Sequence, residues 1–183
     1  MKFRWIILLA ALVFQGCAST GQSADQRRQS IEQMRANTLN KLYKEKPYAA
    51  DSIERAAGYA VFSNANVNLL IASAGGGYGV VHSNSGAVTY MKMGEVGVGL
   101  GLGAKDYRLV FVFHTKAAMD RFINDGWAFG GQMDAAAKAQ EKGDAIGGEL
   151  TVDSITIYQL TETGLALQAT IKGTKFWRDD SLN

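Results

Sequence analysis

The stretch GEVGVGLGLG, from Gly94 to Gly103, contains five glycines in ten residues. Toward its end every second residue is a glycine, and the residues between them are valine or leucine. Successive side chains of a β-strand point to opposite faces, so this spacing predicts a strand with one apolar face and one bare face. The bare face would let another element, or an acyl chain, pack closely on the sheet. The structural glycines of this prediction are Gly97, Gly99, Gly101 and Gly103.

The same stretch also contains a dinucleotide-binding pattern, because Gly99, Gly101 and Ala104 have G-x-G-x-x-A spacing. That fingerprint requires a helix that opens inside the glycine turn, so that the helix N-terminus meets the pyrophosphate. The residues that follow are DYRLVFVFH, 106–114, and their composition predicts a strand instead. The sequence therefore predicts no nucleotide site and no cofactor.

Short apolar stretches bounded by turn residues lie on both sides of the glycine strand. They predict strands at YAVF (59–62), VNLLIAS (67–73), GGGYGVVH (75–82), AVTYMKM (87–93), SITIYQL (154–160) and LALQATIKG (165–173). The last two are predicted to pair across TETG, a four-residue hairpin connection. The stretch 127–139 predicts a strand that frays into a loop of small residues.

A helix is predicted between these strands, after residue 114. Thr115 is its expected N-cap, and Gly126 its expected stop. Its apolar face consists of Met119, Phe122 and Ile123. Many short strands with few helices predict an α+β fold, built on a curved, mostly antiparallel β-sheet or partly closed barrel. An N-terminal helix and this mid-chain helix are expected to pack on it.

The first sixteen residues have the features of a secretory signal peptide. Lys2 and Arg4 precede an apolar run of ten residues, 5–14. A membrane-spanning helix needs about 20 such residues, so this run has the length of a signal instead. We therefore expect residues 1–16 to be removed.

The sequence around Cys17, the only cysteine, resembles a bacterial lipobox. We expect acylation of this cysteine and a flexible tether over 17–24. Ala18 follows it, which resembles the outer-membrane sorting signal of Gram-negative lipoproteins and predicts a position on the periplasmic side of the outer membrane. An ordinary signal followed by an incidental cysteine is the alternative.

Removal of the leader changes the charge of the chain. The sequence holds 19 Lys and Arg and 17 Asp and Glu, and two of the basic residues lie in the leader. The remaining basic and acidic side chains are equal in number, so the charge gives no support for a nucleic-acid partner. With a single cysteine, neither an intramolecular disulfide nor a cysteine zinc site is possible.

Few residues offer catalytic chemistry. His82 and His114 lack a second histidine or a carboxylate at metal-ligand spacing. Two serines follow His82 in a polar turn, without a G-x-S-x-G elbow. Asp179 and Asp180 lie in a polar C-terminal tail and are predicted to be solvated. We therefore predict no metal site and no enzyme.

Residues 25–46 predict a long helix that stops before Pro47. One of its faces alternates apolar and basic residues in steps of three and four: Arg28, Ile31, Arg35, Leu39, Leu42 and Lys46. This six-residue stripe has two interpretations. It suits an interfacial helix, whose stems lie in lipid while the cationic heads reach phosphates. Alternatively, the arginine stems cover the edge of the protein's own core, with Arg28 and Glu32 paired across one turn.

Several of these stretches, in this order and spacing, resemble the SYLF domain family. The likeness spans about 51–183 and is carried by AAGYAVF (56–62), AGGGYGVV (74–81), EVGVGLGLGAKDYRLVFVF (95–113), GWAFGGQMDAAA (126–137) and IYQLTETGLALQATIKG (157–173). The resemblance implies a non-enzymatic domain that binds anionic phospholipid, helped by an N-terminal amphipathic segment. It raises the lipid interpretation of the helix 25–46 to equal standing with the other.

One departure from the family concerns its eukaryotic members. They carry a Trp-Ser and a proline before the glycine strand, whereas this chain has Val88, Thr89, Tyr90 and Met91. Eukaryotic partner functions such as actin binding are therefore not expected here. The sequence identifies no protein partner. Its alternative function is that of a structural or interaction lipoprotein, whose anchor alone contacts the membrane.

Overall fold

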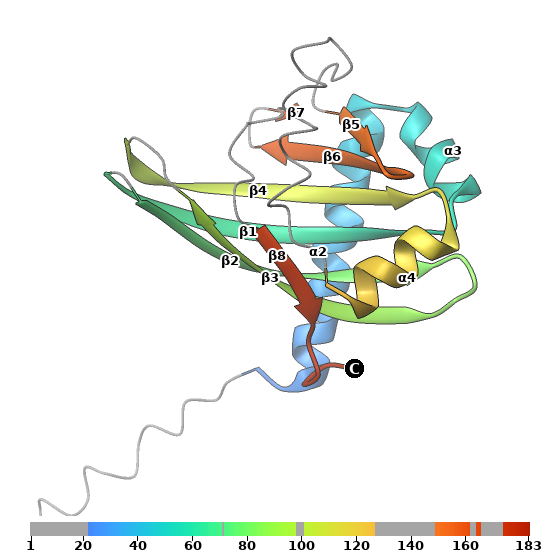
Figure 1. Cartoon of the computed structure of the whole chain (residues 1–183), viewed down its shortest axis with the longest axis horizontal. Coiled ribbons are helices and arrows are strands. Elements are labelled where there is room, and N and C mark those ends of the chain that lie inside the picture. The colour runs from blue at the N-terminus through green and yellow to red at the C-terminus, as the bar shows by residue number, and fades with distance from the viewer. Residues whose placement is uncertain (1–21, 71, 98–100, 127–148, 162–163, 166–173) are drawn as a thin grey trace, which may run out of the picture.

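The structure, a computed structural model, describes residues 22–70, 72–97, 101–126, 149–161, 164–165 and 174–183. Figure 1 shows a curved antiparallel sheet with α2 on one face and α4 on the other. The helices are α2 (Ala24–Glu45), α3 (Tyr48–Arg55) and α4 (Lys116–Asn124). The strands are β1 (Gly58–Leu70), β2 (Ala72–Ser83), β3 (Val88–Gly97), β4 (Gly101–Phe113), β5 (Glu149–Val152), β6 (Ile155–Thr161), β7 (Gly164–Leu165) and β8 (Thr174–Arg178).

The order of the strands confirms the predicted α+β class. The sheet runs β5-β6-β4-β1-β2-β3-β8, and β7 pairs with β6. Because β5 and β8 lie at opposite edges, the sheet is open and not a closed barrel. Within the described ranges, no helix is both long enough and apolar enough to cross a bilayer.

The glycine stretch is divided between two strands, and this corrects the prediction of one continuous strand. β3 ends at Gly97, β4 begins at Gly101, and residues 98–100, including Gly99, lie outside the described part. β3 and β4 are not neighbours, because β1 and β2 lie between them in the sheet. A strand follows the glycines and no helix opens there, as predicted. Close packing on these glycines stays a prediction.

Other boundaries also differ from the sequence expectation. The strand predicted at 59–62 and the first four residues of the strand predicted at 67–73 form one strand, β1. β1 ends at Leu70, and Ala72 and Ser73 belong to β2. β6 and β7 pair with Thr161 opposite Gly164, so their link is two residues long. The stretches 127–139 and 166–173 lie outside the described residues.

Both faces of the central strands are buried, because helices cover each side. Phe111 and Phe113 of β4 belong to the core under α4, together with Phe62 of β1. Val110 and Val112, the residues between, belong to the core under α2. The sequence LVFVF is continuously apolar for this reason.

Two glycines of β2 permit close contact with β1. A Cβ at Gly77 would collide with the carbonyl oxygen of Ser63, and one at Gly79 with the carbonyl of Val61 and the ring of Phe62. A Cβ at the adjacent Gly76 would fit without a collision, because its nearest neighbouring atom would be 3.9 Å away. Gly77 and Gly79 therefore allow β2 to approach β1 closely, a role that the sequence analysis did not assign to them.

The helix ends agree with their sequence signals. Ser23 and Gln26 form a capping box at the start of α2, and Glu45 ends that helix ahead of Pro47. Thr115 accepts a hydrogen bond from the backbone N–H of Ala118, as expected of an N-cap. Gly126 has φ +64°, a conformation that favours glycine after a helix.

The C-terminal tail returns along β3 to the start of α2 (Figure 1). Leu182 is buried against Ile31 of α2 and Val80 of β2. The Asn183 side chain accepts a hydrogen bond from the Tyr90 N–H (2.9 Å) and donates one to the Tyr90 carbonyl (2.8 Å). The tail therefore ties the first helix to the edge of the sheet.

Candidate functional site

The apolar members of the predicted stripe on α2 lie in the protein's own core. Ile31, Leu39 and Leu42 are buried. Leu39 and Leu42 belong to the cluster that includes Val110 of β4 and Tyr158 of β6. This side of the sheet is itself apolar, so the helix buries its stripe there and not in an external phase.

The cationic members of the stripe are engaged at the edge of that core. Arg28 donates to the Leu182 carbonyl (2.9 Å) and to Asp25 (2.7 Å), so the expected pair with Glu32 is wrong. Arg35 donates to Glu32 (2.7 Å) and to the Tyr59 hydroxyl (2.9 Å). These contacts match the second interpretation, in which arginines border the domain core.

Glu32 forms a small ionic network on this side of α2. Its carboxylate contacts Arg35 and the Nε2 atom of His82 (2.9 Å), and the His82 ring stacks on Tyr59. Burial raises the pKa of Glu32, but hydrogen bonds from Arg35 and His82 outweigh it and hold the pKa below its ordinary value. The network therefore fixes α2 to β2. Lys46, the last member of the stripe, lies apart from it, with its Nζ atom 5.6 Å from the centre of the Tyr48 ring.

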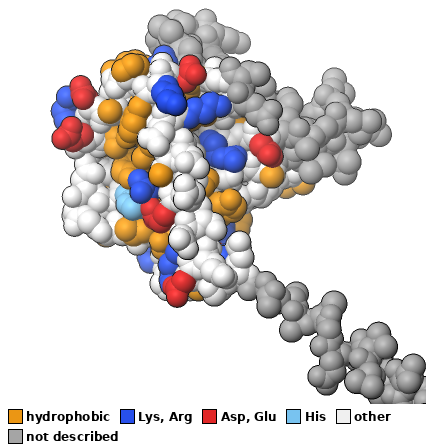
Figure 2. All heavy atoms as spheres, turned by 180° about the vertical axis from the view of Figure 1, so that it is seen from behind, with side chains coloured by type: hydrophobic (Ala, Val, Ile, Leu, Met, Phe, Trp, Pro, Cys, Tyr) orange, Lys and Arg blue, Asp and Glu red, His pale blue; other side chains and the backbone are white. Residues whose placement is uncertain are grey.

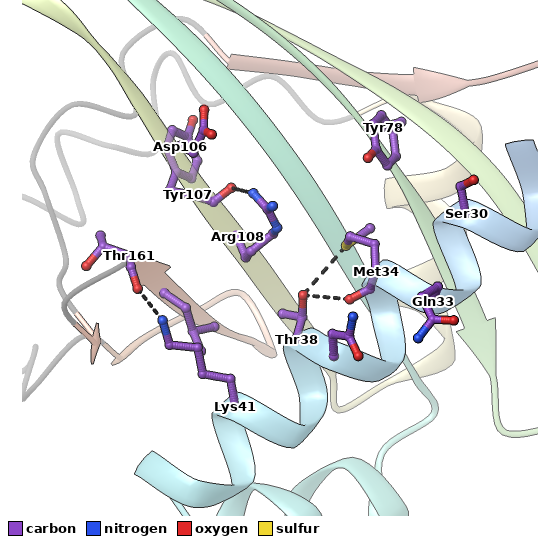
Figure 3. A pocket seen from close by; sticks show the side chains of 12 residues that line it. Ser30, Gln33, Met34, Thr38, Lys41, Tyr78, Asp106, Tyr107, Arg108 and Thr161 are labelled. Atoms are coloured by element: carbon purple, nitrogen blue, oxygen red, sulfur yellow. Dashed lines mark hydrogen bonds between the residues drawn. The ribbon is translucent and has the colours of Figure 1, made fainter.

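The opposite flank of α2 borders a groove of about 460 Å³. The other wall of this groove is formed by residues of β2, β4 and β6. From the helix it is lined by Ser30, Gln33, Asn37 and Lys41, and from the sheet by Tyr78, Asp106, Arg108 and Thr161. Figure 3 shows the helical side chains on one wall and those of β2 and β4 on the other. Met34, Thr38, Tyr107 and Leu160 complete the lining. The groove therefore combines apolar surface with hydroxyl, amide, cationic and carboxylate groups.

Two cations enter this groove from opposite walls. Lys41 donates to the Thr161 carbonyl (2.6 Å), and Arg108 donates to the Tyr107 carbonyl (3.2 Å), as Figure 3 shows. The half-buried guanidinium of Arg108 makes this one hydrogen bond among the described residues, which leaves further N–H donors for a ligand. Figure 2 shows Lys and Arg side chains gathered on this face, with an acidic group beside them.

Sequence reasoning did not select these groove residues, although the signals were present. Arg108 alternates with Val110 and Val112, and Asp106 precedes it on the same strand face, so two charged residues continue an apolar stripe. Ser30, Gln33, Asn37 and Lys41 recur at helical spacing on the flank beside the predicted stripe. What the sequence could not supply is the strand order that brings β4 under α2.

Asp179 contradicts its prediction as a solvated tail residue. Its side chain is 1% exposed and contacts Arg27 of α2 (2.9 Å) and Lys92 of β3 (2.9 Å). The backbone N–H and hydroxyl of Ser181 also donate to it. The carboxylate is buried because the tail folds under α2, and it is balanced by two cations.

Glu95 is a second buried carboxylate, on the α4 face of β3. It accepts hydrogen bonds from Asn64 of β1 (2.7 Å) and from the hydroxyl of Tyr107 of β4. Burial raises its pKa, and the hydrogen bonds from Tyr107 and Asn64 offset only part of that effect.

Each of the two histidines contacts a polar side chain. His82 contacts Glu32, and the Nε2 atom of His114 lies 2.8 Å from the Thr156 hydroxyl. In the described ranges, no group of three or more His, Cys, Asp or Glu side chains could hold a metal ion. Cys17 and Gly99, two further predicted sites, lie outside these ranges.

Comparison with known proteins places the chain in a family. The family model Ysc84, described as "Las17-binding protein actin regulator", matches residues 94–183. The curated "Beta cell expansion factor A" of Aeromonas veronii is 34% identical over 164 residues, which are 88% of this chain and 60% of that protein. The chain thus spans about three fifths of the relative's length, and the family is not a known enzyme family. These matches, with the motifs quoted above, show that the chain belongs to the SYLF family, the family of the Ysc84 model.

Proposed function

We propose that this protein is a membrane-anchored module of the bacterial envelope. It binds anionic phospholipid through the groove that α2 forms with β2, β4 and β6. The observation that carries the proposal is the pair of cations, Lys41 and Arg108, in a groove with both polar and apolar walls. The family resemblance described above points to the same class of ligand. This site replaces the α2 stripe, whose apolar residues lie in the domain core.

The groove has suitable chemistry for a phosphate headgroup. A guanidinium binds phosphate oxygens through paired, charge-assisted hydrogen bonds, and an ammonium adds a mobile point charge. Ser30, Gln33 and Asn37 supply neutral donors and acceptors for the polar part of a headgroup. A volume of about 460 Å³ falls in the range of small-ligand sites.

The predicted acyl anchor at Cys17 would support binding in this groove. A short tether holds the domain at a high effective concentration near the bilayer, so a weak headgroup site can be occupied. Outer-membrane sorting remains part of the proposal. The protein would then act by binding lipid and not by catalysing a reaction.

Vesicle flotation tests this function with a chain from Ser23 to Asn183, which contains every described helix and strand. We expect co-flotation with anionic vesicles, little with zwitterionic vesicles, and a loss at high salt. Each cation near an anionic surface contributes about 1 kcal/mol, so Lys41→Gln with Arg108→Gln should lower the partition coefficient by more than about tenfold.

The matched control is Lys116→Gln with Arg121→Gln, which removes the same charge from α4 on the other face of the sheet. We expect this control to float like the unmodified chain. Melting temperatures of both double variants separate a loss of binding from a loss of folding. If the unmodified chain floats with no vesicle composition, lipid binding is refuted and the anchor-only interaction lipoprotein is favoured.

A further inference from the structure

A row of side chains crosses the α2 face of the sheet just beyond the helix. The strand register places Trp177 of β8 opposite Lys92 of β3, which lies opposite Tyr78 of β2. Tyr78 in turn lies opposite Ser63 of β1, and Ser63 opposite Arg108 of β4. Opposed residues share a face of the sheet, so the row continues from the groove to the β8 edge.

Large apolar side chains are exposed along this row. Tyr78 is 43% exposed, Trp177 is 39% exposed, and Val96, on the same face of β3, is 67% exposed. Gly76 and Gly94 lie opposite each other in the next row, so the sheet carries no side chain at these two positions beside the aromatic residues. The Trp177 ring lies over Gly94, where an added Cβ would be 3.1 Å from the ring.

The composition of this surface matches that of a membrane interface. Tyr and Trp rings are enriched at the level of lipid headgroups, because each ring has an apolar body and a polar group. Two cations lie on this surface. Lys175 is on the same face of β8 as Trp177 and lies opposite Gly94, and Arg108 is at the β4 end of the row. Cations at this depth pair with lipid phosphates. Asp106 is the acidic residue beside Arg108 in the groove.

The tether reaches the domain close to this edge. Asp179 joins Arg27, in the first turn of α2, to Lys92 in the row. The seven residues 17–23 span at most about 25 Å when extended, so an anchor at Cys17 would keep the start of α2 near the bilayer. Figure 1 shows the C-terminus and the start of α2 at the same end of the sheet.

We propose that the surface formed by Tyr78, Val96, Lys175, Trp177 and Arg108 lies against an anionic lipid bilayer, with both aromatic rings at headgroup level. This orientation rests on the proposed function and adds the face that meets the membrane. The groove then opens toward the headgroups, and the concave core under α4 faces away from them.

Brominated phospholipid provides the test, because bromine near the headgroup end of an acyl chain quenches tryptophan at short range. The full chain with Trp5→Phe and Trp127→Phe retains tryptophan at position 177 alone. In brominated anionic vesicles we expect its emission to shift to shorter wavelength and to be largely lost. The comparison uses the same vesicles without bromine.

The matched control places the reporter elsewhere on the same anchored chain. In the chain with Trp5→Phe and Trp127→Phe, the further changes Trp177→Phe and Tyr48→Trp move the tryptophan to α3, where Tyr48 is 51% exposed. This reporter should keep its emission. Equal quenching at positions 48 and 177, or greater quenching at 48, would overturn the orientation. If the Trp127→Phe chain fails to fold, the difference in quenching between the unmodified chain and Trp177→Phe gives the same answer.

The two proposals fail in different ways. A Ser23–Asn183 chain that floats with anionic vesicles, together with an unquenched position 177, would refute only the orientation. A chain that does not float would refute lipid binding by the domain, whatever the fluorescence of the anchored protein.

Discussion

Glu95 is a carboxylate that the fold encloses between strands, with 5% of its surface exposed. Asn64 and Tyr107 donate hydrogen bonds to it, but the Oδ1 atom of Asn64 has no hydrogen-bond partner among the described residues. Burial dominates and raises the pKa of Glu95. Relative to the unfolded chain, the folded state therefore disfavours the ionised carboxylate, so ionisation of Glu95 costs stability.

The sign of this linkage gives a prediction for Glu95→Gln. A carboxyl whose pKa is raised in the folded state stabilises the fold below its unfolded pKa, and this contribution is lost as the pH rises through the folded pKa. The stability of Glu95→Gln relative to the unmodified chain should therefore increase from about pH 4 to about pH 7. Urea unfolding of both proteins at the two pH values measures this difference in the free energy of unfolding. A difference that stays constant or decreases with pH would contradict a raised pKa of Glu95.

β2 shows what alternation means for a glycine-rich strand. Gly77 faces the backbone of β1 and the Met93 side chain, whereas a Cβ at its neighbour Gly76 would meet no atom closer than 3.9 Å. A strand with glycine at both positions gains close contact on one face only. The other glycine costs about 0.5–1 kcal/mol relative to alanine without a packing gain.

Two adjacent alanine substitutions in β2 should therefore differ strongly in their effect on stability. Gly77→Ala drives a Cβ into the Ser63 carbonyl and should lower the free energy of unfolding by about 3 kcal/mol or more. Gly76→Ala meets no close atom and should leave stability unchanged or raise it by about 0.5 kcal/mol. Chemical denaturation of the two variants measures both changes in the free energy of unfolding. Equal effects would show that β1 and β2 do not approach as closely as described.

Local patterns predicted the elements more reliably than their arrangement. The α+β class, the helix stop before Pro47, the Thr115 N-cap and the strand after Gly103 all follow from signals within a few residues. The order of strands does not, because it depends on contacts between distant segments. For this reason the glycine stretch was expected as one strand although it spans the connection from β3 to β4.

The site was less predictable than the fold. The stripe on α2 was identified from its periodicity, but periodicity does not say whether the sheet or a membrane covers it. Lys41 and Arg108 come together only because α2 crosses the sheet above β4. Glu95 and Asp179 are buried by strands and a tail far away in sequence, so their neighbouring residues gave no indication of it.

At the scale of the whole molecule, Asp179 joins the two ends of the described chain. Arg27 comes from the first helix, Lys92 from the middle of the sheet, and Ser181 from the tail. Burial raises the pKa of Asp179, but hydrogen bonds from Ser181 and Lys92 outweigh it and hold the pKa below its ordinary value. The charged carboxylate is thus the form that stabilises the fold.

Asp179→Asn tests this junction. Its cation partners are each more than a third exposed, so solvent screening limits the loss to about 1–3 kcal/mol at neutral pH. A depressed folded pKa gives stability that is present above the unfolded pKa and lost as the pH falls through the folded one. The difference from the unmodified chain should therefore shrink at about pH 3, and an equal loss at both pH values would argue against an ionic role.

The contact between Asn183 and Tyr90 has a consequence for proteins crowded together on a surface. A primary amide side chain imitates a peptide group, so it occupies the backbone N–H and carbonyl that β3 would otherwise offer to a strand from another molecule. The outer strands β5 and β8 are short, at four and five residues. Short or blocked edges oppose intermolecular β-pairing. High local density should therefore not drive these chains to aggregate through the edge of β3 at this position.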